Sequence, residues 1–165
     1  MEATCKAAGH ADMDVLHALR REFCRHQEIA FDEQRAGGAL ACLLNDQSLG
    51  RVWLIDSGGA TIGYVVLIFS YSLEFDGRDA YVDEIYLPEP YRGRGLGPNT
   101  LLFAEGVCAA LGVRARHLGV DRNNVRALTA YLKAGFEDRN HFLLTKRIAT
   151  RSARVGTAPR RGVAP

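Results

Sequence analysis

Residues 91–98 have the composition of a loop that binds phosphate. They read Tyr-Arg-Gly-Arg-Gly-Leu-Gly-Pro and lie between an expected strand and an expected helix. Glycines spaced by two allow successive backbone N–H groups to converge on an anion, and the following helix adds the positive end of its dipole. Arg92 and Arg94 add fixed positive charge, and Pro98 suits a first helical turn, where the N–H groups have no intrahelical partner. The alternative interpretation is a Gly-rich surface turn with exposed arginines.

Two common nucleotide-binding motifs are excluded for this loop. A dinucleotide-binding loop requires G-x-G-x-x-G, but Pro98 does not fit that pattern after Gly93 and Gly95. A P-loop requires the sequence G-K-[ST], which is absent. The loop therefore favours a phosphate-bearing ligand that neither motif describes.

The loop and a downstream helix together resemble the GNAT N-acetyltransferase family. Arg92-x-x-Gly95-x-Gly97 resembles the family signature R/Q-x-x-G-x-G/A, in which the loop holds the pyrophosphate of coenzyme A. Residues 124–136 resemble its second motif, N-x-x-A-x-x-(L/F)-Y-x-x-x-G-F, except that alanine occupies the (L/F) position, residue 130. Pro98 is a second departure, because it removes an N–H that could meet phosphate. The resemblance covers about residues 3–148, and its specific part is residues 81–136.

The resemblance implies acetyl-CoA as co-substrate, and the scattered cysteines, which are not grouped with the histidines, argue against a metal site. The resemblance also implies that main-chain groups at the end of the preceding strand pair with the pantetheine arm, as an added strand would. The residues expected to contact the cofactor are Ile85, Tyr86, Leu87, Arg92, Gly93, Arg94, Gly95, Leu96, Gly97, Pro98, Asn124 and Tyr131.

Helical spacing places the two polar residues of the second motif on one side of their helix. Asn124 and Tyr131 are seven positions apart, nearly two turns, so their side chains lie roughly 10 Å apart along the axis. The opposite flank, formed by Val125, Leu128 and Leu132, is expected to supply the core contact. The alternatives are that Asn124 is simply a residue of the helix N-terminus and that Tyr131 is a half-buried aromatic residue.

Two adjacent acids precede the expected pantetheine contact. Residues 81–87, Tyr-Val-Asp-Glu-Ile-Tyr-Leu, resemble the polyamine, diamine and thialysine acetyltransferase branch of the family. That resemblance makes Asp83 the general base and Glu84 the residue that helps hold the amine, although which acid is the base stays open. Neighbouring strand residues point to opposite faces unless the strand is bulged. Alternatively, one acid forms an ion pair with a loop arginine.

An ammonium group must lose a proton before its nitrogen can attack a thioester, and a carboxylate is the usual acceptor of that proton. Main-chain N–H groups near Ile85 could stabilise the oxyanion, and Tyr131 is the expected acid for the leaving thiolate. We expect direct transfer in a ternary complex to a polyamine or diamine. An amino acid, an amino sugar and a protein N-terminus are the alternative acceptors.

Acids on the expected acceptor side would attract cations: Glu28, Asp32, Glu33, Glu74, Asp76 and Asp79.

The elements that must position these residues follow from periodicity and turn signals. Helical spacing predicts a first helix after Asp12, with Val15, Leu16, Leu19 and Phe23 on one face, and further helices near residues 32–45, 97–111 and 123–133. Runs rich in β-branched and aromatic residues predict strands at 3–8, 51–55, 62–71, 80–87 and 115–120, and a last pair of short strands within 136–148. The predicted order is β-αα-βββ-α-β-α-ββ. This order favours an α/β fold with a mixed, mostly antiparallel sheet and helices on both faces.

Composition limits the remaining possibilities. The 165 residues suit one domain at 1–148, followed by a basic tail at 149–165 that is expected to be mobile. Removing the four tail arginines from the net charge of +2 leaves −2 for the rest, which argues against nucleic acid as a partner. Four scattered cysteines predict reduced thiols, and the absence of a leader or a long apolar run predicts a cytoplasmic protein without membrane contact. A homodimer is possible, and the competing class is a non-catalytic acetyl-CoA sensor or interaction module.

Overall fold

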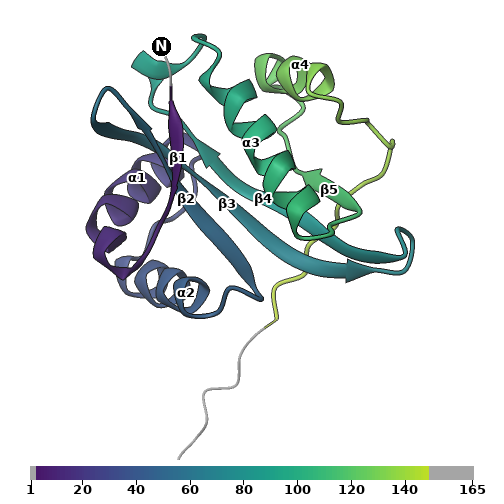
Figure 1. Ribbon diagram of the computed structural model, residues 1–165, viewed down its shortest axis with the longest axis horizontal. Coiled ribbons are helices and arrows are strands. Elements are labelled where there is room, and N and C mark those ends of the chain that lie inside the picture. The colour runs from purple at the N-terminus through teal and green to yellow at the C-terminus, as the bar shows by residue number, and fades with distance from the viewer. Residues whose placement is uncertain (1–2, 149–165) are drawn as a thin grey trace, which may run out of the picture.

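The computed structural model describes residues 3–148, which form a five-stranded sheet with strands in the order β1-β2-β3-β4-β5 (Figure 1). Neighbouring strands are antiparallel except for β4 and β5, which are parallel. The strands are β1 (Thr4–Ala7), β2 (Gly50–Ser57), β3 (Ala60–Ser72), β4 (Gly77–Tyr86) and β5 (Ala115–Leu118). The helices are α1 (Met13–His26), α2 (Glu33–Asn45), α3 (Leu96–Ala110) and α4 (Val125–Lys133), with short 3-10 turns η1 (His10–Asp12) and η2 (Glu89–Tyr91).

The alternation of side chains along the strands builds one hydrophobic cluster on each face of the sheet. On one face, α1 and α2 pack Leu16, Leu19 and Leu40 against Val52, Leu54, Tyr64, Val66 and Tyr86. On the other face, α3 packs Ala104 and Cys108 against Trp53, Val65, Leu67, Ala80 and Val82. The mixed sheet with helices on both faces is therefore confirmed, and α4 lies beside α3 (Figure 1).

Turn and capping residues explain where the predicted elements begin and end. Gly58 and Gly59 both have positive φ, which is the backbone that a two-residue hairpin between β2 and β3 requires. The Asp32 side chain accepts a hydrogen bond of 2.9 Å from the Arg35 N–H and so caps α2. Helix α2 is continuous through Gly37-Gly38, because its apolar face packs on the sheet.

One predicted element is wrong. The structure contains no strand between residues 136 and 148, although Phe142, Leu143, Leu144 and Ile148 have strand-forming side chains. These side chains are at least 79% exposed, and Arg139 holds the segment to the β3–β4 turn through an ion pair with Glu74. A segment with strand-forming side chains becomes a strand only where a neighbouring strand pairs with it. Residues 136–148 have no such partner strand within the described residues.

The predicted core face of α4 is also wrong. Val125 and Leu132 are 66% and 49% exposed, and no residue of α4 is fully buried. Helix α4 is short and lies over α3 rather than over the sheet, so its apolar residues do not reach the core. The predicted tail, residues 149–165, lies outside the described residues.

Candidate active site

The Gly-rich loop leads directly into α3, as the sequence predicted. Gly93 and Gly95 have φ of +77° and +82°, and Gly95 is the residue before the first helical turn. Only glycine adopts this left-handed backbone without steric cost, so the two glycines shape the loop. Leu96, 1% exposed, anchors the loop in a cluster with Ile55, Ile62 and Leu87. Backbone N–H groups at the start of α3 are thereby held in a fixed place.

The two loop arginines have different surroundings. Arg92 turns back toward the sheet: its Nε donates to the Leu87 carbonyl oxygen at 2.7 Å, and its Nη1 lies 3.0 Å from His26 Nε2. Arg92 therefore ties the loop to the end of β4 and to α1. Arg94 is exposed to solvent, as are Gly93, Gly95 and Pro98.

Sequence reasoning missed a third arginine at the loop, Arg126 in the first turn of α4. A Cβ atom added at Gly93 would lie 2.7 Å from Arg126 Nη2, so this guanidinium covers the loop. Arg126 is two positions after Asn124, inside the recognised motif. Arg126, Thr129, Ala130 and Lys133 share one face of α4, and this spacing was the signal that could have revealed them.

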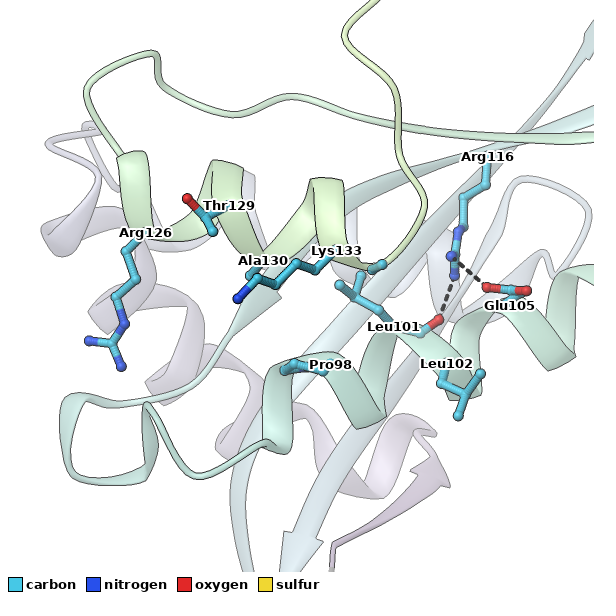
Figure 2. Close-up of a pocket in the computed structure, with 10 residues that line it drawn as sticks. Pro98, Leu101, Leu102, Glu105, Arg116, Arg126, Thr129, Ala130 and Lys133 are labelled. Atoms are coloured by element: carbon cyan, nitrogen blue, oxygen red, sulfur yellow. Dashed lines mark hydrogen bonds and ion pairs between the residues drawn. The ribbon is translucent and has the colours of Figure 1, made fainter.

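That face of α4 and the outer face of α3 enclose a groove of about 350 Å³ (Figure 2). Arg126 stands at one end of the groove, and Arg116 stands at the other, donating to the Leu101 carbonyl oxygen at 2.6 Å and lying 3.3 Å from Glu105. The apolar lining comes from Pro98, Leu101, Leu102, Ala130 and Ala134, and Lys133 adds a third cation. The groove thus combines an apolar floor with positive charge beside the Gly-rich loop.

Strands β4 and β5 separate before β4 ends. Their parallel pairing runs from Asp79 opposite Ala115 to Val82 opposite Leu118, where β5 stops. Strand β4 continues to Tyr86 and remains paired only with β3. Main-chain groups of Ile85 and Tyr86 therefore lie along an opening in the sheet, at the place where the sequence predicted that a pantetheine arm would pair.

Asp83 lies at a β-bulge in β4 at the start of this opening. Val66 is opposite Glu84 and Leu67 is opposite Val82, which leaves Asp83 without a residue opposite it on β3. The bulge that the sequence analysis considered is therefore present. Partial desolvation raises the pKa of the Asp83 carboxyl, the negative charge of Glu84 raises it further, and Arg20 lowers it.

Glu84 is turned toward α1 rather than left free. Its carboxylate accepts hydrogen bonds from the Arg20 side chain at 2.8 and 2.9 Å and from the Tyr64 hydroxyl at 2.7 Å. The alternative, in which one strand acid forms an ion pair with an arginine, thus applies to Glu84, but the arginine belongs to a helix and not to the loop.

Tyr131 is half-buried on α4, and its ring meets Phe136 edge-on with centroids 6.1 Å apart. Burial raises the pKa of the Tyr131 hydroxyl, which keeps the phenol protonated at neutral pH. Asn124 caps α4, because its Oδ1 accepts a hydrogen bond of 3.1 Å from the Ala127 N–H. Gly135, with φ of +86°, ends the helix as the motif predicted.

Most of the acids expected to form a cation-attracting field have local partners. Asp32 caps α2, Glu33 pairs with Arg21, and Glu74 pairs with Arg139. Asp79 is buried against Ser70 and His117. An attraction for cationic acceptors therefore has to come chiefly from other groups, Asp83 among them, because Glu84 is already paired with Arg20.

Comparison with known proteins decides the family. The profile of the Acetyltransferase (GNAT) family matches residues 13–136. The chain belongs to this family. Thialysine N-epsilon-acetyltransferase of Bos taurus is 33% identical over 81 residues, and its counterpart in Mus musculus is 31% identical over 81 residues. Each match covers 49% of this chain and 47% of the relative, so the chain spans about half the length of these curated relatives.

Solved structures share the GNAT fold over most of their length. Integron cassette protein HFX_CASS3, from the mobile metagenome of Cole Harbour Salt Marsh, has a TM-score of 0.79 and 33% identity, with coverage of 89% of this chain and 91% of that chain. A predicted acetyltransferase from Clostridium acetobutylicum, solved with acetyl-CoA, has a TM-score of 0.74 and 16% identity, with coverage of 88% and 96%. The second likeness supports the fold alone.

Two kinds of feature are absent from residues 3–148. No helix in this range has the length and apolar character needed to cross a bilayer. The same range contains no cluster of three or more His, Cys, Asp or Glu side chains placed to hold a metal ion. Cys5, Cys24, Cys42 and Cys108 are all free thiols.

Proposed function

We propose that this protein transfers the acetyl group of acetyl-CoA to a primary amine, with a small cationic polyamine or diamine as the acceptor. The observation that carries the proposal is the opening between β4 and β5. A Gly-rich loop of the kind that binds phosphate lies at one end of this opening, and Asp83, at the β-bulge, lies beside it. A long thiol cofactor with a pyrophosphate group fits this layout, because it needs anion-binding N–H groups and an unpaired strand edge.

The cofactor would be held by three features of the chain. The N–H groups of the Gly-rich loop, with the guanidinium of Arg126 above Gly93, suit the pyrophosphate. Main-chain groups of Ile85 and Tyr86 suit the amides of the pantetheine arm. The groove between α3 and α4 suits the adenosine 3′-phosphate, since its walls are apolar and Lys133 supplies positive charge beside them.

Asp83 is the proposed general base. Its raised pKa makes it a stronger proton acceptor than an ordinary carboxylate, so it takes a proton from the bound ammonium and frees the nitrogen lone pair. The nitrogen then forms a bond to the acetyl carbonyl carbon, and N–H groups near Ile85 stabilise the negative charge on the carbonyl oxygen. Breaking of the C–S bond leaves a thiolate, which the Tyr131 hydroxyl protonates. The products are an amide and coenzyme A.

The acceptor class rests on two arguments. Strand residues 81–87 resemble the polyamine, diamine and thialysine branch, and the curated relatives are acetyltransferases for thialysine, an amine-bearing amino acid. An amino acid, an amino sugar or a protein N-terminus would use the same chemistry with a different acceptor pocket.

A panel of amines tests the proposal. The protein is incubated with acetyl-CoA and, separately, polyamines, diamines, thialysine, amino sugars and short peptides, while free thiol is measured. We expect amine-dependent thiol release that is fastest with polyamines or diamines. Binding of acetyl-CoA without release of thiol by any amine would favour a sensor or interaction module instead.

A further inference from the structure

The Glu84 carboxylate is held by donors from two other elements. Arg20 of α1 donates through Nε to Glu84 Oε2 at 2.9 Å and through Nη2 to Oε1 at 2.8 Å. Tyr64 of β3 donates its hydroxyl to Oε2 at 2.7 Å. The Arg20 and Glu84 side chains are only 20% and 11% exposed. Three donors occupy most of the roughly four lone-pair positions of a carboxylate, so little capacity remains for a substrate ammonium.

The three residues form a rigid unit, here called the Glu84 clamp (Arg20, Tyr64 and Glu84). Tyr64 is fully buried, and burial together with the negative charge of Glu84 holds the pKa of its hydroxyl far above the ordinary value. It therefore remains a donor at every working pH. Arg20 also lies 3.5 Å from the Ala36 carbonyl oxygen, which connects the clamp to α2. Bidentate pairing with an arginine fixes direction as well as distance.

The clamp acts at the first paired position after the bulge. Glu84 is opposite Val66, and Asp83 immediately before it has no residue opposite. A bulge redirects the side chain at the extra residue, but a strand can shift its register around such a point unless a neighbour is fixed. Holding Glu84 on the α1 face therefore holds Asp83 in its place at the opening between β4 and β5.

We propose that Glu84 is a positioning residue that fixes the bulge and so aims Asp83 at the acceptor amine; this inference rests on the proposed function. This role differs from that of a residue that holds the amine, because the clamp directs the Glu84 oxygens toward Arg20 and Tyr64. The clamp also joins α1 and α2 to β4, the strand that carries Asp83, so a shift of those helices would move the base.

The charges around Asp83 agree with this role. Partial burial and then Glu84 raise the pKa of Asp83 and Arg20 lowers it, while burial and then the charge of Asp83 raise the pKa of Tyr81 on the same strand. Pairing Glu84 with Arg20 keeps these opposing influences at fixed distances from the base.

Two conservative variants test the clamp without altering either strand acid. Tyr64→Phe removes one donor, and Arg20→Lys keeps the charge but removes the bidentate geometry. We expect kcat to fall by roughly 10- to 100-fold in each, since a base displaced by about 1 Å loses that much. The KM for the amine and the dissociation constant of acetyl-CoA should stay within about twofold. Tyr71→Phe on the exposed part of β3 and Arg21→Lys in an exposed ion pair of α1 are the matched controls.

The outcomes separate the two roles of Glu84. A raised amine KM with unchanged kcat would show that the Arg20–Tyr64–Glu84 unit serves amine binding, and unchanged values of both would show that the clamp is unnecessary; either result overturns the proposal. If the unmodified protein acetylates no amine, the proposed function fails, and the carbon NMR signal of the Asp83 carboxyl still tests the clamp. That signal should shift in Tyr64→Phe and stay in place in Tyr71→Phe, and an unshifted signal in Tyr64→Phe would contradict the clamp.

Discussion

Among single residues, the proposed chemistry depends on two groups whose surroundings raise their pKa. The raised pKa of Asp83 strengthens it as a base, and the raised pKa of Tyr131 keeps its hydroxyl protonated at neutral pH. The family resemblance suggested both residues, Asp83 from the strand at 81–87 and Tyr131 from the motif at 124–136, but it left open which strand acid is the base. The structure supports Asp83, because Glu84 is engaged by Arg20 and Tyr64.

Replacing Tyr131 by phenylalanine tests the proton donor. The substitution removes only the hydroxyl, so acetyl-CoA should bind as before while kcat falls by roughly 10²-fold. Isothermal calorimetry measures the binding and steady-state rates measure kcat. The matched control is Tyr71→Phe on the exposed part of β3, which should leave kcat nearly unchanged. An unchanged kcat in Tyr131→Phe would assign the proton donor elsewhere.

The pH dependence of the rate tests the base. The raised pKa of Asp83 means that the carboxylate is lost as pH falls through that pKa, so the rate should decline on the acid side at a higher pH than an ordinary aspartate would give. Asp83→Asn should lose rate at neutral pH and regain part of it at high pH, where free amine is abundant. Glu84→Gln should shift the acid-side decline to lower pH, because the negative charge that raises the pKa of Asp83 is gone. A profile for Asp83→Asn that matches the unmodified protein would exclude Asp83 as the base.

At the scale of elements, local signals predicted most of what positions the site. Helix α3 was predicted to begin near residue 97 and begins at Leu96, and the strands predicted at 51–55 and 62–71 lie within β2 and β3. The Arg20–Glu84 pair could not be predicted, because its members are 64 positions apart and nothing in either neighbourhood marks the other. Arg126 was missed although its spacing with Thr129, Ala130 and Lys133 marks one face of α4, because its position beside Gly93 depends on how α4 lies against the loop.

The two wrong predictions about elements, the strands within 136–148 and the core face of α4, also have physical causes. The apolar residues of 136–148 predicted strands, but a strand forms only with a partner, and the ion pair of Arg139 with Glu74 holds the segment elsewhere. Helix α4 has an amphipathic pattern, yet that pattern does not reveal whether the apolar side meets a core or another helix.

Gly93→Val tests the loop. The substitution places a side chain at a positive φ and drives it toward Arg126, so acetyl-CoA affinity should fall roughly tenfold or more. Gly106→Ala, in the middle of α3 where an added Cβ meets nothing, is the control. Calorimetric affinity for acetyl-CoA is the measurement, and unchanged affinity in a folded Gly93→Val protein would place the pyrophosphate elsewhere.

Comparison of coenzyme A with its form lacking the 3′-phosphate tests the groove. Lys133→Ala should weaken the binding of coenzyme A by roughly tenfold and leave the binding of the form without the 3′-phosphate unchanged, because only the 3′-phosphate would meet Lys133. Arg126→Ala should weaken the binding of both forms, since both carry the pyrophosphate. Arg122→Ala, beside α4 and stacked on Phe142, is the matched basic control. Equal losses of affinity for the two forms in Lys133→Ala would contradict the placement of the 3′-phosphate in this groove.

At the scale of the whole molecule, the features proposed to carry catalysis lie within the range that the family profile matches. The opening, the loop and α4 all fall inside residues 13–136. Removal of residues 149–165 is therefore expected to leave kcat on small amines within about twofold. A large loss of kcat in the shortened protein, measured beside the full chain, would contradict this expectation.

The central claim is that acetyl groups pass directly from acetyl-CoA to an amine at Asp83, and isotopic labelling tests it most directly. Acetyl-CoA labelled with ¹³C in the acetyl group is incubated with the preferred amine and the protein, and masses of amine and protein are measured together with free thiol. The account predicts one labelled acetyl on the amine for each thiol released, an unchanged protein mass, and little product from Asp83→Asn at neutral pH. A labelled protein, or bound acetyl-CoA that never reaches any amine, would contradict it.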